Sequence, residues 1–249
     1  MLYNPWHGCH KFSAGCVNCY VYRMDKMFDR DPSIVKKTKN FDLPIQKNRQ
    51  NEYRLKAHDG YLYTCLSSDF FIEEADQWRD DVWQMIKTRS DLSFCIITKR
   101  IHRFMSCLPK DWNDGYPNVT ISVSIEDQDS LDQRLPLLIT LPIKHKRINC
   151  EPLLTRLDFK ELLSGNTIQH ISVGGESGNN ARVCDYDWVL DIRRQCVENN
   201  TYFSFKQTGA KFVKDGKLYQ ISKQDQHPQA KKSNIDYQRE VKDEKEKKK

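Results

Sequence analysis

The sequence lacks any apolar run approaching the roughly 20 residues that a membrane-spanning helix needs, so we expect no membrane segment. It also lacks a charged-then-apolar leader, because it begins Met1-Leu2-Tyr3-Asn4. Its nine cysteines are odd in number and do not have the dense, even pattern of a secreted disulfide scaffold. We therefore expect a protein of the reducing cytoplasm, in which thiols remain available to bind metal.

Most of the chain also has little net charge. The formal net charge is +6, and the segment 223–249 supplies half of it, with nine Lys/Arg against six Asp/Glu. The remaining 222 residues carry only +3, which is compatible with a polyanionic substrate but does not require one. Because the segment 223–249 has few apolar residues, we expect one domain at 1–222 followed by a charged, disordered tail.

Short β-prone apolar runs alternate with helix-like stretches between the N-terminal cysteines and this segment. The expected strands are 61–66, 94–98, 119–124, 146–150, 168–173 and 202–205. Their nearly continuous hydrophobicity is typical of strands that are buried on both faces. Amphipathic helices are expected at 75–88, 130–137 and 186–199. This alternation predicts an α/β fold with parallel strands, either a partial or complete (β/α) barrel, which we favour, or an open doubly wound sheet.

Polar and glycine-rich residues follow each expected strand. In a barrel these strand ends meet at one mouth, where binding and catalytic groups gather. The alternative is that they are ordinary polar loops. The segments are Ser67-Ser68-Asp69, Thr98-Lys99-Arg100, Glu126-Asp127, Cys150-Glu151-Pro152, Gly174-Gly175-Glu176-Ser177 and Lys206-Gln207.

Three cysteines near the start, Cys9, Cys16 and Cys19, have the spacing C-x6-C-x2-C. Soft thiolates select zinc or iron–sulfur clusters. A zinc ion would need a fourth ligand, which His7 or His10 could supply. A cubane cluster held by three cysteines leaves one iron without a protein ligand. No second C-x2-C completes a zinc ribbon, which counts against a structural zinc site.

The residues around these cysteines resemble the signature of the radical S-adenosylmethionine (SAM) superfamily, in particular that of spore photoproduct lyase-like proteins. The matching residues are Asn4, Pro5, Gly8, Tyr20 and Arg23. The gap of six residues after Cys9 is longer than the three of that signature and is similar to the phage Gp37/Gp68 family, also called DUF5131. Later segments resemble that family in the same order, namely 97–100, 122–126, 150–154, 173–178 and 205–207.

This resemblance implies a radical SAM enzyme. Cys9, Cys16 and Cys19 would bind a [4Fe–4S] cluster, and SAM would bind the fourth iron. An electron donor protein would reduce the cluster, and a 5′-deoxyadenosyl radical would remove hydrogen from the substrate. The expected substrate is a nucleic-acid base or nucleotide, modified by lyase or isomerase chemistry. Two alternatives are a zinc-stabilised nucleic-acid-binding protein without catalysis and a radical SAM enzyme that acts on a peptide or small metabolite.

The remaining candidate residues are less tightly specified. Ser67, Ser68 and Asp69 are expected to bind the SAM amino group. Lys99 and Arg100 suit the SAM carboxylate or a substrate phosphate, or they simply begin a solvated helix. Glu126 would orient a ribose or the substrate, or make structural hydrogen bonds. Gly174, Gly175 and Glu176 would contact SAM or substrate, or form a turn with no ligand. Cys150 is a candidate hydrogen-atom donor, with a small buried hydrophobe as the alternative.

Overall fold

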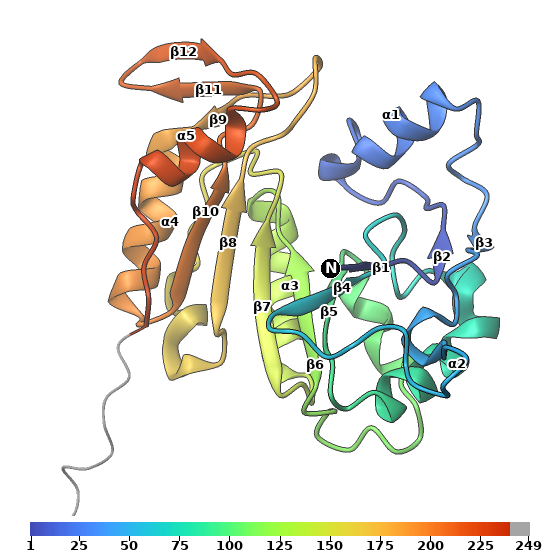
Figure 1. Ribbon diagram of the computed structural model, residues 1–249. Helices are drawn as coiled ribbons and strands as arrows, with labels where there is room; N and C mark the ends of the chain where they lie inside the picture. Colours follow the sequence, from blue (N-terminus) through green and yellow to red (C-terminus); the bar gives the residue numbers. More distant parts are fainter. Residues whose placement is uncertain (240–249) are drawn as a thin grey trace, which may run out of the picture.

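Seven parallel strands form one sheet, which curls into a half-barrel (Figure 1). The computed structural model describes residues 1–239 except for the side chain of Asn166. The strand order is β1-β4-β5-β6-β7-β8-β10, and every neighbouring pair is parallel. All six predicted strands are confirmed, as β4 (Tyr61–Thr64), β5 (Ser93–Thr98), β6 (Val119–Ser124), β7 (His145–Cys150), β8 (His170–Gly174) and β10 (Tyr202–Gln207). The sequence reading missed β1 (Leu2–Tyr3), which adds to the β4 edge.

Three helices carry the apolar surface that packs against the sheet, and all three were predicted. They are α2 (Asp76–Thr88), α3 (Gln128–Thr140) and α4 (Tyr186–Glu198). Val82, Trp83 and Ile86 of α2 are fully buried, at the spacing of one helix face. α3 begins at a capping box in which Asp127 accepts from the Ser130 backbone N–H, a common way to start a helix. Two other crossovers contain 3₁₀ helices instead, at Ile101–Cys107 and Lys160–Asn166.

Every residue of β6 is buried, as expected for a strand buried on both faces, but β4 and β7 alternate between buried and partly exposed residues. In β7 the buried residues Lys146, Ile148 and Cys150 alternate with the partly exposed Arg147 and Asn149. The ammonium of Lys146 donates to a carbonyl of α3, so the buried set faces the outer helices. Arg147 and Asn149 therefore point to the concave side. The concave side of β7 is thus polar and partly exposed.

The segment after 222 departs from the predicted tail. Helix α5 (Gln226–Lys232) packs against β10, with Gln226 and Ala230 buried. Beyond it, the Asp236 carboxylate accepts from the Phe205 N–H at 2.8 Å, and Tyr237 pairs with Phe203. Residues 223–239 are thus part of the fold. A few inward-facing side chains are enough to hold this polar segment against β10. The rest of the predicted tail, 240–249, lies outside the described residues.

The N-terminal segment and a late hairpin stand at the carboxyl end of the sheet (Figure 1). The N-terminal segment contains β2 (Trp6–His7), α1 (Tyr20–Met27) and β3 (Lys36–Lys37). The hairpin consists of β11 (Lys211–Lys214) and β12 (Lys217–Gln220), and β9 (Cys184–Asp185) pairs with β11. Among residues 1–239, no helix is both long and apolar enough to cross a membrane.

Candidate functional site

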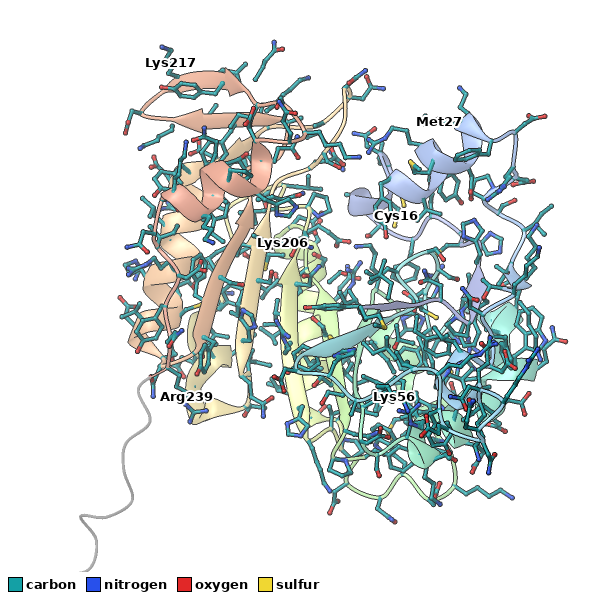
Figure 2. All side chains as sticks on the ribbon, in the orientation of Figure 1. Cys16, Met27, Lys56, Lys206, Lys217 and Arg239 are labelled. Carbon is teal, nitrogen blue, oxygen red and sulfur yellow. The ribbon has the colours of Figure 1, made fainter. Side chains whose placement is uncertain are left out.

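A cavity of about 400 Å³ lies at the carboxyl ends of the parallel strands, between the N-terminal segment and β10. Cys9, Cys16 and Cys19 all line it, as the spacing of the motif suggested. Lys206 at the end of β10 lines the opposite wall, and Figure 2 shows Cys16 and Lys206 on either side of this opening. The site is therefore built from the N-terminal loop on one side and the strand ends on the other.

The segment that leads to Cys9 is bound to the loop that follows β4. The Gly8 N–H donates to the Ser67 carbonyl at 3.1 Å, and the Asn4 side-chain oxygen accepts from the Ser67 N–H at 3.2 Å. The indole of Trp6 donates to the Asp69 carbonyl at 3.1 Å. The Ser68 hydroxyl also donates to the Gly8 carbonyl. These contacts explain Asn4 and Gly8 of the motif, together with the neighbouring Trp6, as an attachment to the sheet.

Asp69 and Arg100 link the end of β5 to the same loop. The Asp69 carboxylate accepts from the Thr98 hydroxyl at 2.7 Å and from the Lys99 N–H at 2.9 Å. Arg100 lies 3.4 Å from that carboxylate and donates to the His10 carbonyl at 2.9 Å. It also donates to the Cys9 sulfur at 3.7 Å. Asp69 and Arg100 thus hold the Cys9 loop in place, and their polar atoms are already bonded to protein.

Glu126 lies underneath the cysteine loop and is fully buried. Its carboxylate accepts from Ser13 at 2.8 Å, from Arg134 at 2.8 Å and from the Lys99 ammonium. Burial alone would raise the pKa of Glu126, but Lys99 and Arg134 hold it below its usual value. A Cβ on Gly15 would sit 2.5 Å from the Glu126 Cγ, so only glycine allows the loop this close.

Glu176 binds the loop from the other side, after β8. Its carboxylate accepts from the side-chain amide of Asn18, between Cys16 and Cys19, at 3.0 Å. It also accepts from the Arg182 N–H at 2.8 Å and pairs with the Arg182 guanidinium. Burial would raise the pKa of Glu176, but the hydrogen bonds from Arg182 and Asn18 hold it below its usual value. Glu176 therefore fixes the Cys16–Cys19 turn.

The structure brings most of the predicted site residues to the cavity, but not all of them. The predicted residues that line it are Cys9, Cys16, Cys19, Ser68, Asp69, Lys99, Arg100, Gly175 and Glu176. The predicted residues outside its lining are Ser67, Glu126, Gly174 and Cys150. Cys150 is fully buried on the helix-facing side of β7, and burial raises the pKa of its thiol well above the usual value. It therefore has the surroundings of a small core side chain.

Sequence reasoning missed Ser124 and Asn149 as groups of the cavity, whereas Glu151 and Lys206 were among the polar residues expected after the strands. Ser124 and Asn149, on neighbouring strands in register, face it without a hydrogen bond from either side chain to any part of residues 1–239. Across the cavity, Glu151 accepts from the Ser172 hydroxyl at 2.8 Å and from the Lys206 ammonium at 2.6 Å. The signal that could have found Asn149 is the period-two alternation of polar residues along β7.

The two histidines nearest the cysteines have protein partners. His7 and His10, the candidate fourth ligands of a zinc ion, are bonded to Asp25 and Glu74 instead. In the part of the chain from 1 to 239, no three His, Cys, Asp or Glu side chains converge as a single metal ion requires.

Comparison with known proteins gives one match. A family model described as "Protein of unknown function (DUF5131)" matches residues 1–247. No curated protein and no solved structure matches the chain.

Proposed function

The chain belongs to the DUF5131 family, and we propose that it is a radical SAM enzyme whose [4Fe–4S] cluster is bound by Cys9, Cys16 and Cys19. The observation that carries the proposal is that these three thiols line one cavity at the carboxyl end of a parallel half-barrel. With the cluster and SAM bound, the site would supply a 5′-deoxyadenosyl radical that removes hydrogen from the substrate.

The first role of the protein's own residues is to fix the positions of the three thiols. Arg100, Glu126 and Glu176 reach the cysteine loop from the ends of β5, β6 and β8, and each also makes an ion pair. Removing one partner of a buried ion pair commonly costs about 3–5 kcal/mol, because the other charge stays buried. These contacts restrict the conformations of the loop before any ligand binds, which lowers the ordering cost of binding.

The second role is to bind SAM beside the cluster. Ser124 and Asn149 present to the cavity a hydroxyl and an amide that have no hydrogen-bond partner among residues 1–239, and these groups suit the ribose hydroxyls or the adenine edge of SAM. The ammonium of Lys99 also faces the cavity and would attract the SAM carboxylate, although it shares its charge with Glu126. Asp69 and Arg100 are already bonded within the protein, so we assign them to the loop.

We further propose that the substrate is a nucleic-acid base or nucleotide. The β11–β12 hairpin stands at the same end of the sheet as the cavity (Figure 1). It carries Lys211, Lys214 and Lys217, none of which pairs with an acidic side chain of residues 1–239. Lysines at this end of the sheet that have no acidic partner in the described part of the chain suit the phosphates of such a substrate.

The test is anaerobic reconstitution with iron and sulfide, followed by reduction with dithionite in the presence of SAM. We expect about four irons per chain, absorbance at about 400 nm and formation of 5′-deoxyadenosine. The variant Cys16→Ala should lose the iron, and Cys107→Ala, a buried cysteine outside the cavity, should keep it. A colourless protein with one zinc would contradict the proposal in favour of a zinc-stabilised binding protein.

The substrate is tested separately with deuterated nucleotides and oligonucleotides. Transfer of deuterium to 5′-deoxyadenosine from one of these compounds supports a nucleic-acid substrate. Transfer only from a deuterated peptide or small metabolite would leave the radical chemistry intact and overturn the substrate.

A further inference from the structure

One arginine on the concave face of the sheet has no carboxylate beside it. Arg147 lies in the middle of β7, is partly exposed and forms no ion pair within residues 1–239. None of the seven strands of the sheet contains Asp or Glu. Lys206, the strand cation that lines the cavity, differs because Glu151 pairs with its ammonium at 2.6 Å. The positive charge of Arg147 is therefore not balanced by any residue of the strands.

The side chain of Arg147 reaches over the concave face of the half-barrel. Its guanidinium carbon lies 5.0 Å from the centre of the Tyr61 ring. Tyr61 belongs to β4, and the strands β5 and β6 separate β4 from β7 in the curled sheet (Figure 1). Three strand spacings amount to about 14 Å in a flat sheet, so the two side chains meet only by extending toward each other. The guanidinium thus lies over the inner face and not among the outer helices.

The hydrogen bonds around Arg147 leave donors free and no acceptors. A guanidinium carries five N–H groups. One of them donates to Nδ1 of His170, and the other four donate to no atom of residues 1–239. An imidazole that accepts at Nδ1 carries its proton on Nε2, which here donates to the Ser204 hydroxyl at 2.8 Å. The O–H of Ser204 is then left to donate to a ligand.

A positively charged group of donors suits a negatively charged group of acceptors. Phosphate has only acceptor oxygens, and arginine binds two of them at once through parallel N–H groups. A terminal phosphate offers three oxygens where a carboxylate offers two. Three acceptors match the paired N–H groups of Arg147 together with the O–H of Ser204. The edge of a nucleobase carries donors as well as acceptors, so it suits these residues less well.

Arg147 lies a short distance along the strand from the cavity. Asn149, two residues later in β7, lines the cavity together with Ser124, its partner in β6. Two residues of a parallel strand extend about 7 Å. A phosphate at Arg147 would therefore place the sugar or base of the same molecule next to the two groups that we assign to SAM.

We propose that Arg147 and Ser204 form a subsite for the phosphate of the substrate. The substrate is then a nucleotide or a nucleic-acid strand and not a free base or a nucleoside. The proposal rests on the proposed function, since it names the part of that substrate which the concave face binds. No bond is made or broken at the subsite, whose role is to bind and position the substrate.

The test measures how much a phosphate group adds to binding. Calorimetry gives the affinity of the reconstituted protein for the four deoxynucleoside 5′-monophosphates, for the four nucleosides and for dinucleotides whose one phosphate is internal. We expect at least one phosphorylated compound to bind at least tenfold more tightly than its nucleoside. A gain with a monophosphate indicates a free nucleotide, and a gain confined to dinucleotides indicates a nucleic-acid strand.

Variants assign this gain to Arg147. In Arg147→Gln the phosphate should add less than threefold to the affinity, and nucleoside binding should not change. Arg147→Lys keeps the charge without the paired N–H groups, so its gain should be intermediate. The matched control is Arg49→Gln, since Arg49 is exposed, lies outside the strands and has no acidic partner among residues 1–239. Urea unfolding shows which variants are folded, and Arg147→Lys decides if Arg147→Gln is not.

A second measurement reports on the subsite itself. In protein that contains isotope-labelled histidine, the bound phosphate should move the NMR signal of the His170 ring. That signal is identified by its loss in His170→Gln. A His170 signal that stays in place when the protein is saturated with the phosphorylated compound would place the phosphate elsewhere and overturn the proposal.

Other results would also contradict the subsite. These are equal affinity for nucleosides and their phosphates, an equal loss in Arg49→Gln, or weaker binding of S-adenosylhomocysteine with unchanged nucleotide binding in Arg147→Gln. Movement of the His170 signal by succinate and by no phosphate compound would assign the subsite to a carboxylate instead. Phosphate-dependent binding without formation of 5′-deoxyadenosine would contradict the radical chemistry and leave the subsite standing.

Discussion

At the scale of single residues, Gly178 shows how closely the cysteine loop fits the barrel. It has a φ of +104°, and a Cβ there would lie 1.8 Å from a guanidinium nitrogen of Arg23. Arg23 donates to the Ser177 carbonyl at 2.9 Å, which ties the start of α1 to the loop after β8. The Tyr-x-x-Arg part of the motif thus has a structural role that depends on a glycine 155 positions later.

We predict that Gly178→Ala displaces Arg23 and lowers the iron content after reconstitution. The matched control is Gly60→Ala, since Gly60 has a φ of +94° but nothing within 4 Å of its added Cβ. In both variants an alanine adopts a left-handed backbone conformation, which destabilises the fold by about 1 kcal/mol. Only in Gly178→Ala does the added Cβ also clash with Arg23. Iron analysis and urea unfolding measure the two effects. Equal iron content in both variants would contradict the role of Arg23.

His170 is a second residue with a measurable effect, on the concave face of the sheet. Burial and the nearby Arg147 lower its pKa to about 3. The Arg147 guanidinium donates to Nδ1, and Nε2 lies 2.8 Å from the Ser204 hydroxyl. The imidazole is therefore neutral in the folded protein at pH values where a histidine in the unfolded chain is protonated.

We predict that this histidine makes the protein less stable in mild acid. Between pH 6.5 and pH 3 the unfolded chain binds a proton that folded His170 does not, so the free energy of unfolding falls as pH falls, by at most about 1.4 kcal/mol per pH unit. His170→Gln should reduce this slope between pH 5 and 6 in urea titrations. Above pH 7.5 the difference between the two proteins should be constant. Identical slopes at pH 5–6 would rule out a neutral His170.

At the scale of elements, the sequence predicts those strands and helices that a local pattern of residues determines. Apolar runs located six strands, since such runs are buried in a parallel sheet. β1 was not predicted because its two residues are too few to show a pattern. α5 was not predicted because only Gln226 and Ala230 face inward. The cysteines were found by spacing. Whether Glu176 binds a ligand or Asn18 was not predictable, because that contact joins residues 158 positions apart.

For α5 we predict that Ala230→Asp lowers the free energy of unfolding by about 2–3 kcal/mol, because it buries an unpaired carboxylate against β10. Gln229→Asp, on the exposed side of the same helix, should change it by less than about 0.5 kcal/mol. Urea unfolding followed by circular dichroism measures both. If the two variants are equally stable, residues 226–232 do not dock as described.

At the scale of the whole molecule, two parts meet at the cavity. One is the half-barrel, whose core is buried between sheet and helices. The other is the cysteine loop, which the half-barrel holds through contacts after β4, β5, β6 and β8. The loop has little core of its own, so its order depends on those contacts and on any ligand that it shares with the barrel.

We predict that cluster assembly stabilises these two parts unequally. Backbone amides of residues 9–23 should exchange with deuterium at least tenfold more slowly after reconstitution, because metal bound by three thiols restrains the loop. Amides of β5, β6 and β7 should change by less than about twofold, because the core already protects them. Hydrogen exchange with mass spectrometry resolves both regions. Uniform slowing along the chain would contradict a separately ordered loop.

The distance in sequence between the loop and its attachments also has a consequence during synthesis. Cys16 is made early, whereas Glu176 and Arg182, which hold its loop, follow about 160 residues later. Chains are synthesised at about 5–20 residues per second, so roughly 10–30 s pass between synthesis of Cys16 and synthesis of the residues that hold its loop. Newly made chains thus carry these thiols before their site exists, and under the proposed function iron delivery would follow completion of the polypeptide.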